Sequence, residues 1–289
     1  MDFVSAKTRR EALDCLDDRG DQTSIVAGGT DVMVQLGLKQ LSPAVLLHVE
    51  RLSELAEIHE GETVVIGSLA TQRALAENPL ISQKFPSLKS AASLCGGWQT
   101  QSVGTIGGNV CNASPAADLI PVLLVHDAIV TLESKSRGER KLPLSKFVLG
   151  RRKTARDKDE LLTSFSLVQP PPYSGCAFVK VGRRSAMEIS IVNAAVRISL
   201  DCDGLISDVA IAVGSVGPVA FRPTEAEDLI RGRRLADISM GEVAQCLLDW
   251  ATPIDDVRGS QTYRRNVLPR VFERCLKDAA QIASRNLEN

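Results

Sequence analysis

Two pairs of adjacent glycines constrain the fold of this chain more than any other feature. One pair lies in Ala27-Gly28-Gly29-Thr30-Asp31 and the other in Thr105-Ile106-Gly107-Gly108-Asn109. Because glycine has no Cβ, each pair lets the backbone approach a bound molecule closely. Two such segments in one chain could hold a diphosphate from both sides. Neither segment has the G-x-G-x-x-G or G-x-x-x-x-G-K-[ST] pattern, so a standard Rossmann or P-loop site is not predicted.

The composition predicts two domains and argues against several classes of function. The 289 residues are 44% hydrophobic and 24% charged, with a net charge of −1, which is ordinary for a globular chain of this length. A charge this close to zero does not favour a nucleic-acid or anionic-membrane partner. No apolar run approaches the roughly 18 residues of a membrane span, and the N-terminus lacks a signal-peptide pattern. We therefore expect a cytoplasmic protein.

The cysteines and histidines do not form a metal-binding or catalytic pattern. The seven cysteines are scattered and never spaced C-x-x-C, which predicts free thiols rather than disulfides, an iron–sulfur cluster or structural zinc. His48, His59 and His126 are not spaced for a metal or a catalytic triad, and Ser68 and Ser114 lack a G-x-S-x-G context. We expect no metal site in this chain, and a bound cofactor that carries the chemistry.

The first 170 residues alternate between strand and helix patterns. A strand, the first glycine pair, a helix and a second strand follow one another over residues 24–49, which predicts a parallel strand pair. The other strands are expected at 64–67, 129–133 and 161–168, and the helices at 6–19, 31–38, 71–76, 88–94 and 118–126. Residues 98–104 are expected to be irregular, the second glycine pair to form a turn, and residues 151–160 to be a strongly charged segment.

Pro170-Pro171-Pro172 is the clearest linker, because proline rings fix φ and make a stiff spacer. We place the domain boundary there, with a first domain at 1–171 (lobes at about 1–55 and 56–171) and a second at 172–289. Beyond the linker, strands are expected at 176–181, 194–200 and 206–213, the last two antiparallel, followed by helices at 224–232, 240–250 and 263–286. Strands followed by helices indicate an α+β fold.

Two polar segments do not distinguish between a structural and a cofactor-binding role. The second glycine pair lies among Thr105, Asn109, Asn112, Ser114 and Asp118, as expected either of a solvated loop or of a loop that contacts a ribose, a diphosphate or a flavin edge. The basic run from Lys180 to Arg184 is equally consistent with solvated charges at a strand edge and with a cation near a cofactor.

Taken in order along the chain, these motifs resemble a known family, the FAD-binding medium subunits of the molybdenum hydroxylases (the xanthine dehydrogenase and carbon monoxide dehydrogenase group). The resemblance covers the whole chain. The matching segments are Ile25–Asp31, Ile66–Thr71, Gly104–Asn109, Ala113–Asp118, Lys180 with Arg183-Arg184, and Pro253–Ser260 with Tyr263-Arg264-Arg265.

The resemblance implies a fold and a set of binding residues. It implies a two-lobed α/β FAD-binding domain followed by a C-terminal domain with a three-stranded antiparallel sheet and helices, with FAD between the lobes and the second domain. The implied FAD contacts are Ile25, Val26, Ala27, Gly28, Gly29, Thr30, Asp31 and Val32 at the diphosphate, Thr105, Ile106, Gly107, Gly108 and Asn109 opposite them, Asp118 as an acidic contact, Leu161 or Leu162 as a packing contact, and Lys180 from the second domain. The loop 181–190 is expected to pass near the isoalloxazine, without the aromatic residue that some relatives carry near Met187 or Glu188.

The resemblance also implies a function. Substrate is hydroxylated at a molybdenum cofactor on a large subunit, electrons cross two [2Fe–2S] clusters on a small subunit, and they reach FAD on this chain, in a dimer of heterotrimers. We hypothesise that Lys180 and the backbone N–H groups of Gly107 and Gly108 stabilise negative charge on reduced flavin. No cysteine-rich insertion is present, which disfavours the relatives that reduce 4-hydroxybenzoyl-CoA. The alternatives are a free-standing FAD-dependent oxidase or reductase, and an assembly subunit that has lost flavin.

Overall fold

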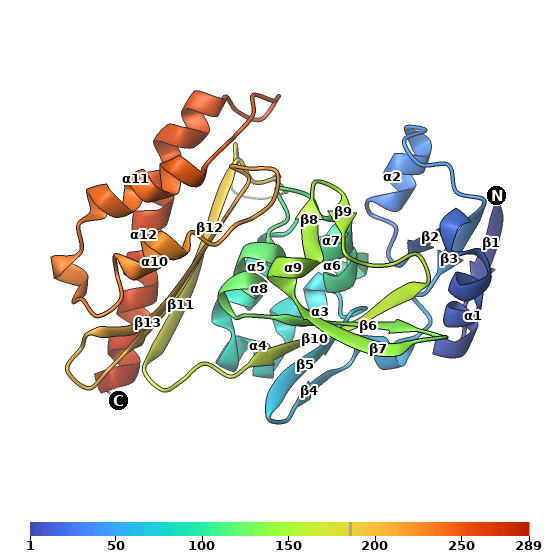
Figure 1. The fold of residues 1–289 in the computed structure, drawn as a ribbon, viewed down its shortest axis with the longest axis horizontal. Helices are drawn as coiled ribbons and strands as arrows, with labels where there is room; N and C mark the ends of the chain where they lie inside the picture. The colour runs from blue at the N-terminus through green and yellow to red at the C-terminus, as the bar shows by residue number, and fades with distance from the viewer. Residues whose placement is uncertain (185–186, 289) are drawn as a thin grey trace.

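The computed structural model describes residues 1–184 and 187–288. Its three main sheets follow one another along the long axis of the molecule, from the N-terminal lobe at the right of Figure 1 to the C-terminal domain at the left. The order of the sheets in space therefore follows their order in the chain.

The N-terminal lobe is a small parallel sheet with the strand order β1-β3-β2. The predicted parallel pairing of β2 with β3 is confirmed. Strand β1 was not predicted, because it has four residues and no alternating pattern. The elements are β1 (Asp2–Ser5), α1 (Arg9–Arg19), a 3-10 turn (Gly20–Gln22), β2 (Thr23–Val26), α2 (Val32–Gly37), β3 (Val45–His48) and a second 3-10 turn (Ser53–Ala56). Helix α1 begins three residues later than expected, since the Thr8 hydroxyl caps it by accepting from the Glu11 N–H at 3.2 Å.

The second lobe is a five-stranded antiparallel sheet with the order β4-β5-β10-β6-β7, whose strands are β4 (Ile58–Glu60), β5 (Thr63–Gly67), β6 (Ile129–Ser134), β7 (Gly138–Pro143) and β10 (Glu160–Val168). Its helices are α3 (Gln72–Glu77), α4 (Pro79–Lys84), α5 (Pro86–Leu94), α6 (Trp98–Val103), α7 (Ile106–Asn112), α8 (Leu119–Val125) and α9 (Leu144–Phe147), and a short hairpin joins β8 (Val148–Gly150) to β9 (Lys153–Thr154). The expected strands at 64–67, 129–133 and 161–168 are confirmed.

Two expectations about this lobe are wrong. Residues 98–103 form helix α6 rather than an irregular stretch. The sequence does not predict this helix because it has no apolar face: Gln101 is the only buried side chain of α6. The second glycine pair belongs to the N-terminal part of helix α7 rather than forming a separate turn. The Thr105 hydroxyl caps that helix by accepting from the Gly108 N–H at 3.0 Å.

The C-terminal domain has the predicted three-stranded antiparallel sheet, in the order β11 (Ser174–Val181), β12 (Val192–Leu200) and β13 (Ile206–Gly214). Helices α10 (Thr224–Asp228), α11 (Met240–Trp250) and α12 (Gln261–Glu288) follow, with a 3-10 turn at Leu235–Asp237. Helix α10 ends four residues before the expected end, because the Gly232 N–H turns back to the Ile206 carbonyl at 2.8 Å. Helix α12 packs on one face of the sheet, and α8 of the second lobe packs against β12 and β13 (Figure 1).

A buried polar contact joins the second lobe to the C-terminal sheet. The Cys176 thiol of β11 donates to the Ser87 hydroxyl of α5 at 2.9 Å, and that hydroxyl lies 3.3 Å from His126 Nε2. The His126 ring also meets the Phe85 ring edge-on. Burial, assisted by the charge of Arg197, lowers the pKa of His126 to about 3. The folded protein therefore holds this imidazole neutral.

We expect His126 to make the protein less stable in weak acid. The unfolded chain binds a proton at this site below pH 6.5, whereas the folded chain does not until about pH 3, so stability falls as the pH drops through that window. Between pH 7 and pH 5 this group lowers the free energy of unfolding by about 2 kcal/mol. Denaturant unfolding of His126→Gln should lack that part of the pH dependence, and the exposed His59→Gln should keep it. Equal pH slopes in wild type and His126→Gln would contradict the assignment.

Candidate functional site

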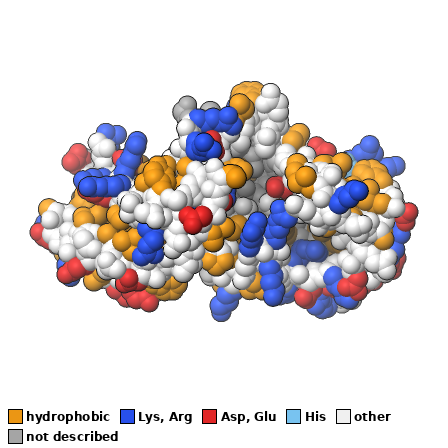
Figure 2. Space-filling model, turned by 90° about the horizontal axis from the view of Figure 1, so that it is seen from above, with side chains coloured by type: hydrophobic (Ala, Val, Ile, Leu, Met, Phe, Trp, Pro, Cys, Tyr) orange, Lys and Arg blue, Asp and Glu red, His pale blue; other side chains and the backbone are white. Residues whose placement is uncertain are grey.

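The two glycine segments line one cavity of about 370 Å³ between the lobes. Figure 2 shows this face of the molecule hollowed between the N-terminal lobe, at the right, and the rest of the chain, with Lys and Arg side chains along one edge. Most of the predicted site residues line it: Ile25, Ala27, Gly28, Gly29, Thr30, Asp31, Val32, Thr105, Gly107, Gly108, Asn109, Leu161 and Leu162. Val26 and Ile106 are buried in the protein and are not part of the lining.

The first glycine segment presents unused hydrogen-bond donors. The backbone N–H groups of Gly28, Gly29, Thr30 and Asp31 donate to no acceptor within the described ranges. A Cβ built on Gly28 would lie 1.9 Å from the Val103 carbonyl oxygen, and Gly29 has φ +72°. These two positions therefore require glycine, and the segment offers a row of free N–H groups suited to an anion.

The second glycine segment is built differently. The N–H groups of Ile106, Gly107 and Gly108 donate to the Ala70 carbonyl at 2.9 Å, the Ser68 carbonyl at 2.8 Å and the Thr105 hydroxyl at 3.0 Å. The protein itself therefore uses both of the N–H groups that the sequence analysis assigned to stabilising negative charge on reduced flavin. A Cβ on Gly107 would lie 2.6 Å from the Ser68 carbonyl oxygen. Glycine is needed at this position for close packing of α7 on the 68–70 segment.

Two buried oxygens in the cavity wall lack partners. Gln72 Oε1 and Asn109 Oδ1 accept no hydrogen bond from any described residue, and both residues line the cavity. A buried acceptor left unsatisfied costs about 1–3 kcal/mol, so these oxygens fit the donor groups of a bound molecule. Gln72 was not predicted as a site residue. It stands at the start of α3, two residues after Ala70, and nothing in its sequence context distinguishes it.

Asp118 and Lys180 lie outside the cavity lining and pair with each other. Lys180 Nζ is 2.6 Å from Asp118 Oδ2 and also donates to the Leu94 carbonyl at 2.9 Å. The other carboxylate oxygen of Asp118 accepts from Ser190 Oγ at 2.5 Å and from Asn193 Nδ2 at 3.0 Å. The pair therefore ties the start of α8 to β11 and β12.

Cys95 connects this ion pair to the cavity wall. Asn109 Nδ2 lies 3.7 Å from Cys95 Sγ. Burial raises the pKa of the Cys95 thiol to about 12, with a further rise from the charge of Asp118 and an opposing effect of Lys180. The thiol is thus neutral, and the charged pair lies close behind the wall that Asn109 forms.

The loop expected near the isoalloxazine is only partly described, since residues 185 and 186 lie outside the described ranges. Met187 has φ +50° and is exposed. A Cβ on Gly97 would lie 2.8 Å from its sulfur, so the Met187 side chain contacts the start of α6.

The described residues contain no cluster of three or more His, Cys, Asp or Glu side chains that could hold a metal ion. All seven cysteines are free thiols. Among the helices that the structure describes, none combines the length and apolar character of a membrane-spanning segment.

The cavity fits a dinucleotide cofactor by its own features: the row of free N–H groups, two glycine positions without room for a Cβ, and two unsatisfied buried oxygens. The comparisons name the family. Residues 1–170 match the family described as the FAD binding domain in molybdopterin dehydrogenase, and residues 177–279 match the carbon monoxide dehydrogenase flavoprotein C-terminal domain. The chain belongs to this family of FAD-binding molybdopterin dehydrogenase subunits.

Individual relatives match over nearly their whole length. The chain is 34% identical to the 6-hydroxypseudooxynicotine dehydrogenase complex subunit alpha of Paenarthrobacter nicotinovorans, over 96% of this chain and 94% of the relative. It is 30% identical to the putative xanthine dehydrogenase FAD-binding subunit of Escherichia coli over the full length of both. The structure matches carbon monoxide dehydrogenase from Hydrogenophaga pseudoflava with a TM-score of 0.93 at 26% identity, over 98% of both chains.

Proposed function

We propose that this chain binds FAD in the cavity between its lobes and transfers electrons within a heteromeric molybdenum hydroxylase. In this proposal the electrons arrive from [2Fe–2S] clusters on a small partner subunit, after hydroxylation of a substrate at a molybdenum cofactor on a large one, and leave to an external acceptor. The observation that carries the proposal is the single cavity formed jointly by the two glycine segments.

The chain's own residues bind the cofactor and set its surroundings. The free N–H groups of residues 28–31 hold the diphosphate, and the wall formed by Leu161 and Leu162 excludes water from one side of the cavity. FAD, when bound, supplies exchange between one-electron carriers and a two-electron acceptor. The Asp118–Lys180 pair lies outside the cavity lining, behind the Cys95 and Asn109 contact, and in this proposal its fixed charges act on the bound flavin through that wall.

We also propose the division of the chain and its assembly. The prolines at 170–172 separate a first domain at 1–171 from a second at 172–289, and the complex is a dimer of heterotrimers. In support, the first family match ends at residue 170 and the second begins at residue 177. The mass of the intact complex measured in solution tests the assembly.

The proposed function is tested on the chain isolated with its natural partners. We expect flavin absorption bands with one FAD per chain, together with molybdenum and iron in the complex. A colourless chain that also fails to bind added FAD would overturn the proposal. Turnover of an organic substrate by the isolated chain would instead favour a free-standing flavoenzyme.

A further inference from the structure

The positive charge of the cavity lining comes from the segment that follows β8. Among the described lining residues only Asp31, Arg152 and Arg156 carry charge. Partial removal from water raises the pKa of the Asp31 carboxyl, whereas the charge of Arg152 and a hydrogen bond with Asn112 oppose that rise. Arg152 therefore lies close to the first glycine segment, and the lining carries more positive than negative charge.

Arg152 is held in an unfavourable backbone conformation. Its φ is +56°, in the left-handed region that costs a non-glycine residue free energy. Its N–H donates to the Ala113 carbonyl at the end of α7 at 3.0 Å. Among the described residues its guanidinium donates to Gln40 Oε1 alone, at 3.2 Å, and no described carboxylate forms an ion pair with it. The structure thus fixes the backbone of Arg152 and leaves most of its donors unused.

Arg156 also lines the cavity. One of its nitrogens donates to the carbonyls of Asp157 at 2.9 Å and Glu160 at 2.7 Å, and within the described ranges it pairs with no carboxylate. Burial raises the pKa of the Cys111 thiol on α7 to about 11, and the charge of Arg156 opposes that rise. The guanidinium is therefore near α7, held by backbone oxygens and with its charge uncompensated.

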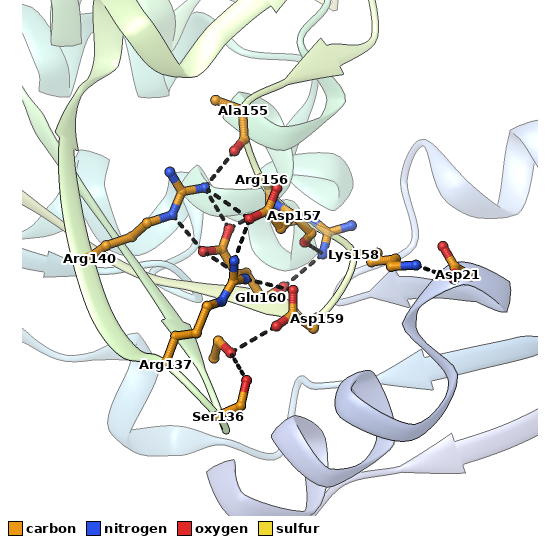
Figure 3. A network of polar contacts seen from close by, with 11 residues as sticks. Asp21, Ser136, Arg137, Arg140, Ala155, Arg156, Asp157, Lys158, Asp159 and Glu160 are labelled. Carbon is orange, nitrogen blue, oxygen red and sulfur yellow. Dashed lines mark hydrogen bonds and ion pairs between the residues drawn. The ribbon is translucent and has the colours of Figure 1, made fainter.

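A charged network fixes the loop that carries Arg156 (Figure 3). The buried Glu160 carboxylate binds Arg140 through both oxygens, at 2.6 and 2.8 Å, and accepts from the Asp157 N–H at 2.8 Å. Arg137 bridges Asp157 and Asp159 at 2.8 and 2.7 Å. Both arginines of the network are thus neutralised by carboxylates, in contrast to Arg156.

The same loop rests on the N-terminal lobe. Lys158 pairs with Asp21 (Figure 3), and a Cβ on Gly20 would lie 2.4 Å from the Lys158 carbonyl oxygen. The loop is therefore held from both lobes, and Arg156 is positioned before any ligand arrives.

We infer that Arg152 and Arg156 bind the diphosphate of the dinucleotide together with the free N–H groups of residues 28–31, with which they share the cavity. Guanidinium groups bind phosphate oxygens through two parallel hydrogen bonds and remain charged at every physiological pH. Two such groups without carboxylate partners, in one cavity with a row of free N–H donors, make an anion site of the size of a diphosphate. This inference deepens the proposed function and rests on it.

The test measures binding of FAD, ADP and riboflavin to the full-length chain freed of cofactor. We expect Arg152→Ala and Arg156→Ala each to weaken FAD and ADP binding about tenfold or more, with riboflavin binding unchanged. The affinity of wild type for FAD should fall more steeply with salt than that of the double variant. Arg156→Lys, which keeps the charge, should recover part of the loss. Arg151→Ala is the matched control, because Arg151 is exposed and does not line the cavity.

The outcomes separate this inference from the proposed function. FAD and ADP affinities within twofold of wild type in both alanine variants would overturn the role of the arginines and leave FAD binding intact. If the wild-type chain binds ADP through the arginines and does not bind FAD, the anion site is supported and the proposed FAD binding is contradicted. A chain that binds neither would overturn both. Thermal unfolding without nucleotide shows whether each variant folds.

Discussion

Replacing Gly28 with alanine is expected to abolish retention of FAD. The new Cβ would lie 1.9 Å from the Val103 carbonyl oxygen and 2.9 Å from the Val103 Cβ, so the first glycine segment must move away from the end of α6. That movement displaces the free N–H groups of residues 28–31, which the proposed function places on the diphosphate. Overpacking of this kind costs about 1–3 kcal/mol of stability, whereas loss of the aligned donors weakens FAD binding by about a hundredfold or more.

The measurement is the ratio of flavin to protein absorbance in the purified chain, with thermal unfolding as a check on folding. Gly37→Ala is the matched control, because Gly37 lies at the end of α2 and a Cβ there would meet no atom within 4 Å. Retention of FAD by Gly28→Ala at the level of Gly37→Ala would show that the first glycine segment does not hold the cofactor.

The sequence predicted those parts of the fold whose residues carry a strong local pattern. Strands β5, β10 and β11 to β13 have long apolar or alternating runs, and all were predicted. Strand β7, Gly-Glu-Arg-Lys-Leu-Pro, is polar and lies at a sheet edge, so its identity depends on pairing with β6 rather than on its own residues. Helix α6 was missed for a similar reason, since a six-residue polar helix is stabilised by tertiary contacts that one sequence does not display.

The sequence predicted the part of the candidate site that the glycine pairs form. It did not predict the residues whose role depends only on their position in the folded chain. The two glycine pairs identified the cavity, because a backbone position with no space for a Cβ requires glycine, which can be recognised in the sequence. Arg152 and Arg156 lie in a segment, residues 151–160, with eight charged residues among its ten, so the two that line the cavity could not be told apart from those that form the Glu160 network. The use of the α7 donors inside the protein likewise depends on the position of Ser68, which is 39 residues away from Gly107 in the chain.

Replacing Lys180 with methionine is expected to destabilise the protein strongly. The side chains of Lys180 and Asp118 are 7% and 5% exposed and their charged atoms are 2.6 Å apart. Removing one partner leaves a buried charge uncompensated, at a cost of about 3–5 kcal/mol in the free energy of unfolding. Lys180→Met with Asp118→Asn should cost less than Lys180→Met alone, since no uncompensated charge remains. Denaturant unfolding measures all three, and Lys277→Met, which removes one half of an exposed pair with Glu273, should change stability by less than about 1 kcal/mol.

The same variants test the effect of the pair on the flavin. Lys180→Met leaves the Asp118 charge behind Asn109, which disfavours electron gain by bound FAD and lowers its reduction potential. Asp118→Asn leaves the Lys180 charge and raises the potential, and the double variant lies between them. If the pair only holds α8 and β11 together, the variants will change stability without opposite shifts in the reduction potential. Equal reduction potentials in wild type and both single variants would therefore restrict the pair to a structural role. Opposite shifts would establish that a residue of the second domain tunes a cofactor bound by the first.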